Sequence, residues 1–231
     1  MVARIPAPQE YVGVFLFFGL FGALAFRLAQ AQVARDPSLS AWLWIAAAAF
    51  AGYVVSDFVS GLVHWTFDTW GSNDSFIVGK AFIHHFRMHH FDPKDITRHG
   101  FVATNGNNCL ATLPALAAAL FIPLEAPWAS AAVAFVVSLC LGVFMTNQFH
   151  KWAHADAVGP FVAFLQASGL ALGREHHDIH HRAPFDTHYC ITTGWLNRPL
   201  MAIGFFRGME RLISRITGAV PRRDDLRDPE R

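Results

Sequence analysis

The sequence predicts an all-α integral membrane protein of about four membrane helices, with a helical cap that carries a histidine-rich site for two metal ions. Two observations predict this class. Hydrophobic residues make up 53% of the 231 residues and concentrate in four apolar stretches. All 13 histidines lie between His64 and His188, mostly three or four residues apart, a spacing that places side chains on one face of a helix.

The apolar stretches define the expected membrane helices. The first runs from about Tyr11 to Ala29, the second from about Ala41 to Trp65 and the fourth from about Ala129 to Phe149. Each is close to the ~20 residues that a membrane span requires. The third, about Leu110 to Ile122, is short and contains Pro114, so we expect it to be kinked or to dip into the membrane. A tight turn joins it to the fourth in a helical hairpin.

The N-terminal stretch has a second interpretation. Residues 1–34 combine an early arginine, an apolar run and small residues, as a cleaved signal peptide does. The length of the run and Arg27 near its end favour a membrane helix. The expected organisation is an N-terminal helix and loop over 1–40, one main domain over 41–215, and a charged, disordered tail over 216–231.

Basic residues predict the orientation in the membrane. Lysine and arginine are frequent in the 66–109 loop and after residue 150, and positively charged loops remain cytoplasmic. His64 and His150 then fall at the inner ends of two spans, so all the histidines can meet in one layer at the cytoplasmic face. In a bacterium, this face belongs to the inner membrane. The short apolar segments Pro160–Leu172 and Leu200–Phe206 fit helices lying in the membrane interface.

The histidine spacings predict a site for more than one metal ion. The paired positions are His64 with Asp68, His85 with His89 (and His90 beside it), His150 with His154, and His177 with His180 and His181. We expect the last three imidazoles to project from one helix face. A single zinc ion needs only four ligands, so the supply exceeds a mononuclear site. Imidazole suits zinc, copper, iron and nickel, and scarce carboxylates with abundant histidine are typical of the di-iron centres of membrane desaturases and hydroxylases, which use O2.

Several polar residues have alternative roles. Asp68 is either a metal ligand or a group that holds a ligand imidazole by its other nitrogen. Asp57, inside a span, orients a ligand or joins helices by a hydrogen bond. An isolated histidine such as His99 or His188 more often makes a hydrogen bond than binds a metal. The three cysteines are too few and too scattered for a disulfide framework, and a net charge of +1 gives no basic field for nucleic acid.

Longer motifs resemble a known family. The segments are His64-Trp65, Asp68-Thr-Trp-Gly71, Phe86-Arg-Met-His-His90, Asp92-Pro93, Ile96-Thr-Arg-His99, Thr104-Asn-Gly-Asn-Asn-Cys109, Asn147-Gln-Phe-His-Lys-Trp-Ala-His154, His176-His-Asp-Ile-His-His181 and Tyr189-Cys-Ile-Thr-Thr-Gly-Trp-Leu-Asn197. Together, over about residues 52–200, they resemble the lipid desaturase family of the plasmanylethanolamine desaturase (Kua) type.

The resemblance implies an enzyme with two iron ions that uses O2 and two electrons to place a double bond in a phospholipid chain near the headgroup, converting a 1-O-alkyl ether to the vinyl ether of plasmalogens. It also implies an external electron donor of the cytochrome b5 or ferredoxin type. The histidines that match the family's motifs are His64, His89, His90, His99, His150, His154, His176, His177, His180 and His181. Of these, His99 and His176, like Asp68, either bind metal or support a ligand; the other eight are the expected catalytic set, whereas His84, His85 and His188 fall outside the motifs.

The sequence departs from the family's usual pattern at Gly100, Ala103 and Asn107, where acidic residues are usual. If those acids contact the headgroup or the redox partner, this chain uses a different lipid or carrier. Two alternative functions remain open: an acyl-chain desaturase or hydroxylase acting on a phospholipid and, from another class, a membrane metal transporter. A transport path would place ionisable residues across the bilayer, whereas only Asp57 is expected inside a span.

Overall fold

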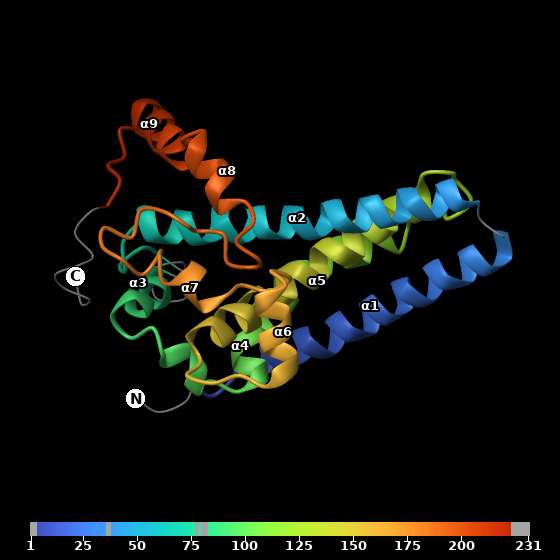
Figure 1. Cartoon of the computed structure of the whole chain (residues 1–231), viewed down its shortest axis with the longest axis horizontal. Helices are drawn as coiled ribbons and strands as arrows, with labels where there is room; N and C mark the ends of the chain where they lie inside the picture. The colour runs from blue at the N-terminus through green and yellow to red at the C-terminus, as the bar shows by residue number, and fades with distance from the viewer. Residues whose placement is uncertain (1–3, 36–37, 77–78, 80–82, 223–231) are drawn as a thin grey trace. The chain divides into compact units, whose positions relative to one another are not determined.

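The computed structural model describes residues 4–35, 38–76, 79 and 83–222. The described residues form helices and no strand, which confirms the all-helical class (Figure 1). The elements are α1 (Pro8–Arg35), α2 (Leu39–Thr69), α3 (His84–Phe91), the short 3-10 helix η2 (Asp95–Arg98), α4 (Phe101–Ala119), α5 (Ala129–His154), α6 (Pro160–Ala167), α7 (Arg174–His177), α8 (Asn197–Ala202) and α9 (Phe205–Thr217).

Three of these helices, α1, α2 and α5, are long and apolar enough to cross a membrane. They correspond to the first, second and fourth apolar stretches. The third stretch lies in α4, which has Pro114 inside its 19 residues and does not reach the same length and hydropathy. Helix α4 begins at Phe101, well before the apolar stretch. Two side chains in its polar first half donate hydrogen bonds to α5: the amide of Asn105 to Gln148 Oε1 at 3.1 Å, and that of Asn108 to the Val143 carbonyl at 2.8 Å.

The chain divides into two compact units, of which one comprises Val2–Asp57 and His99–Gln148. In this unit, α1 packs against α4 around a core that includes Phe17, Leu24 and Leu116, all fully buried. Arg27, which interrupts the apolar surface of α1, donates to the carbonyl of Leu120 at 2.5 Å and thereby supplies a partner for a carbonyl at the end of α4.

The other unit comprises Phe58–Arg98 and Phe149–Arg231, and the division falls inside α2 and α5. It therefore contains the last turns of both long helices. Trp65, Tyr189 and Phe206 form its aromatic core. The segment between α7 and α8 follows the last turns of α2 closely (Figure 1): Ile191 N donates to Ser60 Oγ at 3.0 Å, and a Cβ at Gly61 would lie 2.5 Å from Cys190 Sγ.

The short C-terminal helices differ from their expected bounds. Helix α6 ends at Ala167 rather than Leu172, and Gly169 then adopts a φ of 74°, a backbone conformation that a helix does not use. The expected Leu200–Phe206 helix is two helices, α8 and α9, separated at Gly204 with a φ of 65°. Helix α9 runs on to Thr217, into the segment expected as a tail; residues 223–231 of that segment lie outside the described part.

Candidate metal centre

Five histidines converge on one point in the unit that contains the ends of α2 and α5. His150 and His154 come from the last turns of α5, His89 from α3, His177 from the end of α7 and His181 from the turn that follows. We call them the pentahistidine group. The Nε2 atom of His154 lies 2.9 Å from that of His89, 3.2 Å from that of His150 and 2.9 Å from that of His177. The sequence predicted the α5 pair, and the structure supplies its partners.

A second group lies in the same unit and consists of His64, Asp68, His90 and His180. We call it the Asp68 group. His64 and Asp68 lie one turn apart near the end of α2, with His64 Nε2 3.3 Å from Asp68 Oδ2. His90 Nε2 lies 3.6 Å and His180 Nε2 3.5 Å from the same oxygen. Three imidazoles thus surround one carboxylate.

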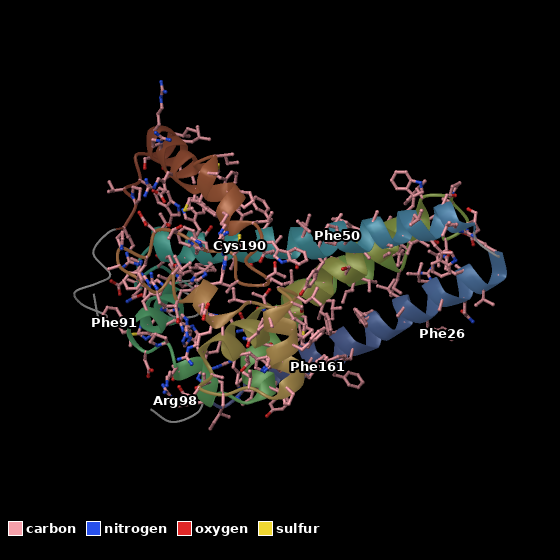
Figure 2. All side chains as sticks on the ribbon, in the orientation of Figure 1. Phe26, Phe50, Phe91, Arg98, Phe161 and Cys190 are labelled. Carbon is pink, nitrogen blue, oxygen red and sulfur yellow. The ribbon has the colours of Figure 1, made fainter. Side chains whose placement is uncertain are left out.

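Two pairs of consecutive histidines each contribute one residue to each group. The doublet His89-His90 of α3 gives one residue to each group, and so does the doublet His180-His181. The ring centroids are 6.4 Å apart in the first doublet and 5.5 Å in the second. Neighbouring ligand groups are what a dinuclear centre requires. Figure 2 shows the side-chain nitrogens gathered around α3 and α7.

Protons cannot satisfy the nitrogens of the pentahistidine group. A neutral imidazole has one N–H and one lone pair, yet His154 Nε2 has three ring nitrogens within hydrogen-bond distance. A cation at the centre would bind all these lone pairs. Each of the five residues offers one ligand atom, and these atoms all lie within 4.8 Å of one another.

Backbone carbonyls orient two imidazoles of the Asp68 group. The Nδ1 of His64 lies 3.1 Å from the Tyr189 carbonyl oxygen, and that of His180 lies 2.7 Å from the Thr187 carbonyl oxygen. Because a carbonyl only accepts, each Nδ1 carries the proton and each Nε2 presents a lone pair. His64 Nε2 and both oxygens of Asp68 are buried and have no hydrogen-bond partner among the described residues. Such orphaned buried acceptors fit a cation site.

Burial keeps the imidazoles outside the spans in their neutral, ligand form. It lowers the pKa of His89, His90 and His177 well below the ordinary value, and neighbouring imidazoles lower it further. Burial lowers the pKa of His180 to about 3 and that of His181 to about 4. These side chains are therefore unprotonated at neutral pH, as metal ligation requires.

Two expected spacings are wrong. His85 does not join His89: it is exposed at the start of α3 and belongs to neither group. His177, His180 and His181 do not share one helix face, because α7 ends at His177 and a turn follows. The turn directs His180 to the Asp68 group and His181 to the pentahistidine group.

The remaining candidates lie outside both groups. His176 is held by Asn197, whose Nδ2 lies 2.9 Å from its Nε2, and its ring packs 5.1 Å from that of His188. His99 and Asp57 belong to the other unit. The groups thus contain the eight histidines of the expected catalytic set and Asp68, but neither His99 nor His176.

The sequence did not reveal the groups that support the ligands. Asn197, almost fully buried, joins the loop together: its Oδ1 accepts from Cys190 N at 2.8 Å and its Nδ2 donates to Cys190 O at 2.9 Å. Gly194 adopts a φ of 80°, and a Cβ there would lie 2.5 Å from His176 Nε2. Both residues belong to the Tyr189–Asn197 motif, the sequence feature from which their supporting role could have been predicted.

A cavity of about 620 Å³ adjoins the Asp68 group. Asp68 and His90 form part of its wall, and the aromatic rings of Phe185 and Tyr189 form another part. The ring of Phe185 stacks on that of His90 at 4.6 Å. A substrate in this cavity would lie directly against two of the candidate ligands.

Comparison with known proteins gives this site its context. Residues 53–224 match the family model described as the lipid desaturase domain. The chain is 46% identical to a plasmanylethanolamine desaturase of Myxococcus xanthus over 94% of its own length and 75% of the relative's, and 46% identical to plasmanylethanolamine desaturase 1 of Mus musculus over 95% and 81%. It is 33% identical to the chloroplastic fatty acid desaturase 4 of Arabidopsis thaliana over 77% and 54%.

No solved structure matches this chain. The family match covers most of the sequence and all of both ligand groups. With its apolar helices and its histidine groups, the chain belongs to the lipid desaturase family and is a membrane lipid desaturase.

Proposed function

We propose that this chain is a plasmanylethanolamine desaturase with a di-iron centre. The observation that carries the proposal is the pair of adjacent ligand groups, which offers eight imidazoles and one carboxylate. The 46% identity to two plasmanylethanolamine desaturases of distant organisms supports the substrate. The acyl-chain alternative has weaker support, since the plant fatty acid desaturase is 33% identical over a smaller share of the chain.

The reaction is the oxidation of one carbon–carbon bond. Two hydrogen atoms leave the two carbons that follow the ether oxygen of the 1-O-alkyl chain, and a vinyl ether forms. These atoms, two further electrons and two protons reduce one O2 to two waters. Two bound iron ions supply the O2 chemistry that removes hydrogen from an unactivated C–H bond, which amino-acid side chains do not perform alone.

The protein's own residues hold and orient the reacting groups. The pentahistidine group would bind one ion and the Asp68 group the other, while the carbonyls of Tyr189 and Thr187 keep two imidazoles in the ligating tautomer. Asp68, the carboxylate, would offset part of the positive charge. Asn197 positions the loop, and His176 contacts Asn197 rather than a ligand group.

The wider setting of the enzyme is part of the proposal. Ligands come from the C-terminal turns of two candidate spans, α2 and α5, and the basic residues of the flanking segments favour a cytoplasmic location for that end. Electrons would come from an external carrier of the cytochrome b5 or ferredoxin type. The substitutions at Gly100, Ala103 and Asn107 bear on lipid or carrier choice; Asn107 is exposed at the surface of α4.

Lipid analysis tests the function directly. The chain is expressed in cells that lack vinyl ethers and are supplied with 1-O-alkyl phosphatidylethanolamine. We expect acid-labile vinyl ether lipid to form. If iron-loaded, folded protein forms none, the proposed substrate is wrong, and a new double bond in an ester-linked acyl chain would favour the alternative.

A further inference from the structure

The cavity beside the Asp68 group carries charges of both signs. Arg207, Arg211 and Arg222 line it together with Asp186 and Glu210. We infer that this cavity binds the phosphoethanolamine headgroup of the substrate: guanidinium groups bind the phosphodiester and carboxylates bind the ammonium. The inference rests on the proposed function and adds to it the residues that select the headgroup.

One helix supplies three of the charged groups, and a hydrogen bond orients one of them. Helix α9 presents Arg207, Glu210 and Arg211 at spacings of three and four residues, hence on one side of the helix. Phe206, one turn before Glu210 and therefore next to it on the helix, packs against Trp65 of α2. Trp65 Nε1 also donates to Glu210 Oε1 at 3.1 Å, which orients the carboxylate. Glu210 is therefore held in place, whereas the side chains of Arg207 and Asp186 are 72% and 44% exposed.

The chemistry of the lining matches a zwitterion. Arginine binds phosphate oxygens through two parallel hydrogen bonds, and Arg207 and Arg211 are adjacent on α9. Asp186 lies 3.2 Å from Arg207 in an exposed ion pair that a ligand's own charges can replace. A primary ammonium donates hydrogen bonds to carboxylates such as Asp186 and Glu210, whereas the quaternary ammonium of choline has no N–H to donate.

The position of the cavity agrees with where the double bond is made. The reacting carbons of a 1-O-alkyl phospholipid are separated from the phosphate by only a few bonds through the glycerol. A headgroup site must therefore lie next to the ligand groups, and Asp68 and His90 are in the cavity wall. Holding the headgroup there would bring the start of the alkyl chain, and not its middle, to the metals.

Helix α9 also suits the depth of a lipid headgroup. Leu212 is 49% exposed and Ile216 73% exposed on the apolar side of this amphipathic helix, and Ile203 in front of it is 74% exposed. Apolar side chains on one face and arginines on the other are typical of helices that lie in the membrane interface. The arginines of such a helix are at the level of the phosphates.

Headgroup preference tests the carboxylates. Asp186→Asn and Glu210→Gln remove charge but keep size and, at position 210, an acceptor for Trp65 Nε1. Vinyl ether formation is measured in nanodiscs with 1-O-alkyl phosphatidylethanolamine and, separately, its choline counterpart. We expect wild type to prefer ethanolamine, and each variant to raise KM for ethanolamine about tenfold with little change in kcat. Asp74→Asn, an exposed acid outside the cavity, is the matched control.

The opposite pattern would overturn the inference. A merely structural role would lower kcat for both headgroups alike and leave their ratio unchanged. If Asp186→Asn and Glu210→Gln retain the wild-type ratio and KM, the carboxylates do not read the headgroup.

Binding without turnover separates this inference from the proposed function. Glycerophosphoethanolamine is titrated into iron-loaded wild type, Arg211→Gln and Arg215→Gln, the last being exposed on α9 outside the cavity. We expect Arg211→Gln to weaken binding about tenfold and Arg215→Gln to leave it unchanged. Such binding in an enzyme that forms no vinyl ether would reject the proposed reaction and retain the headgroup site. Equal binding by all three proteins, or none by wild type, would reject the site.

Discussion

His89 Nε2 and His154 Nε2 lie 2.9 Å apart, although the two histidines come from α3 and α5 and are 65 residues apart in the chain. One proton could bridge this pair. It could not also serve His150 and His177, whose Nε2 atoms lie 3.2 and 2.9 Å from that of His154. His154 is thus the residue on which the pentahistidine group centres.

Replacing His154 tests that group. His154→Ala removes the nitrogen with the most ring-nitrogen neighbours, so we expect bound iron to fall by about half or more and vinyl ether formation to be lost, with the protein still in the membrane. Elemental analysis and lipid analysis measure the two effects. His85→Ala, on exposed surface of α3, is the matched control and should behave as wild type. Full activity of His154→Ala would remove it from the ligand set.

Replacing Asp68 tests whether this residue binds a metal ion directly or only supports a ligand. Neither of its oxygens has a hydrogen-bond partner among the described residues, and three Nε2 atoms lie 3.3–3.6 Å from its Oδ2. We therefore expect direct ligation. Asp68→Asn should lower the iron content from about two ions to about one per chain, because the pentahistidine group is untouched. An unchanged iron content with reduced activity would indicate a supporting role instead.

Gly194 tests the loop that supports the site. Its φ of 80° would be strained for a residue with a side chain, and a Cβ there would clash with His176 Nε2 at 2.5 Å. Gly194→Ala should lower the free energy of unfolding by about 1–3 kcal/mol. Gly208→Ala is the control, because a Cβ there meets nothing within 4 Å inside α9, and it should stabilise by about 0.5–1 kcal/mol. Thermal unfolding in detergent compares them; equal midpoints would contradict the assignment.

His188 lies outside both groups and makes local contacts, as expected of an isolated histidine. It is buried, has a φ of 58°, contacts Thr187 Oγ1 through Nδ1 at 2.9 Å and packs on His176. His188→Ala should therefore retain its iron but lose about 1–2 kcal/mol of stability. Iron loss in a protein that unfolds at the wild-type temperature would show that His188 acts on the metals.

The candidate spans and some of the histidine pairs could be predicted from the sequence because they depend on local patterns. Apolar runs identify α1, α2 and α5, and the i, i+4 spacing identifies His150 with His154. Allocation to two groups could not be predicted, because adjacent residues such as His89 and His90 point in different directions and only packing decides where each goes. For the same reason, the sequence could not show that His180 and His177 belong to different groups, because the turn after α7 separates them.

The long-range contacts of polar side chains could not be predicted from the sequence either. Asn105 lies in a segment that the hydropathy pattern excludes from a membrane helix, yet its hydrogen bond to Gln148 stabilises the first half of α4. Asn197 holds Cys190 and His176 across a loop. Neither contact has a periodic signature, because the partners are brought together by the folded chain.

The metal content of the purified chain tests the central claim most directly. Protein expressed with iron and kept in a membrane mimetic is analysed for iron, zinc and copper per chain. Two adjacent ligand groups predict about two iron ions per chain. Disrupting the pentahistidine group and the Asp68 group together should remove both ions. A single zinc ion per chain in fully active protein would contradict a di-iron lipid desaturase.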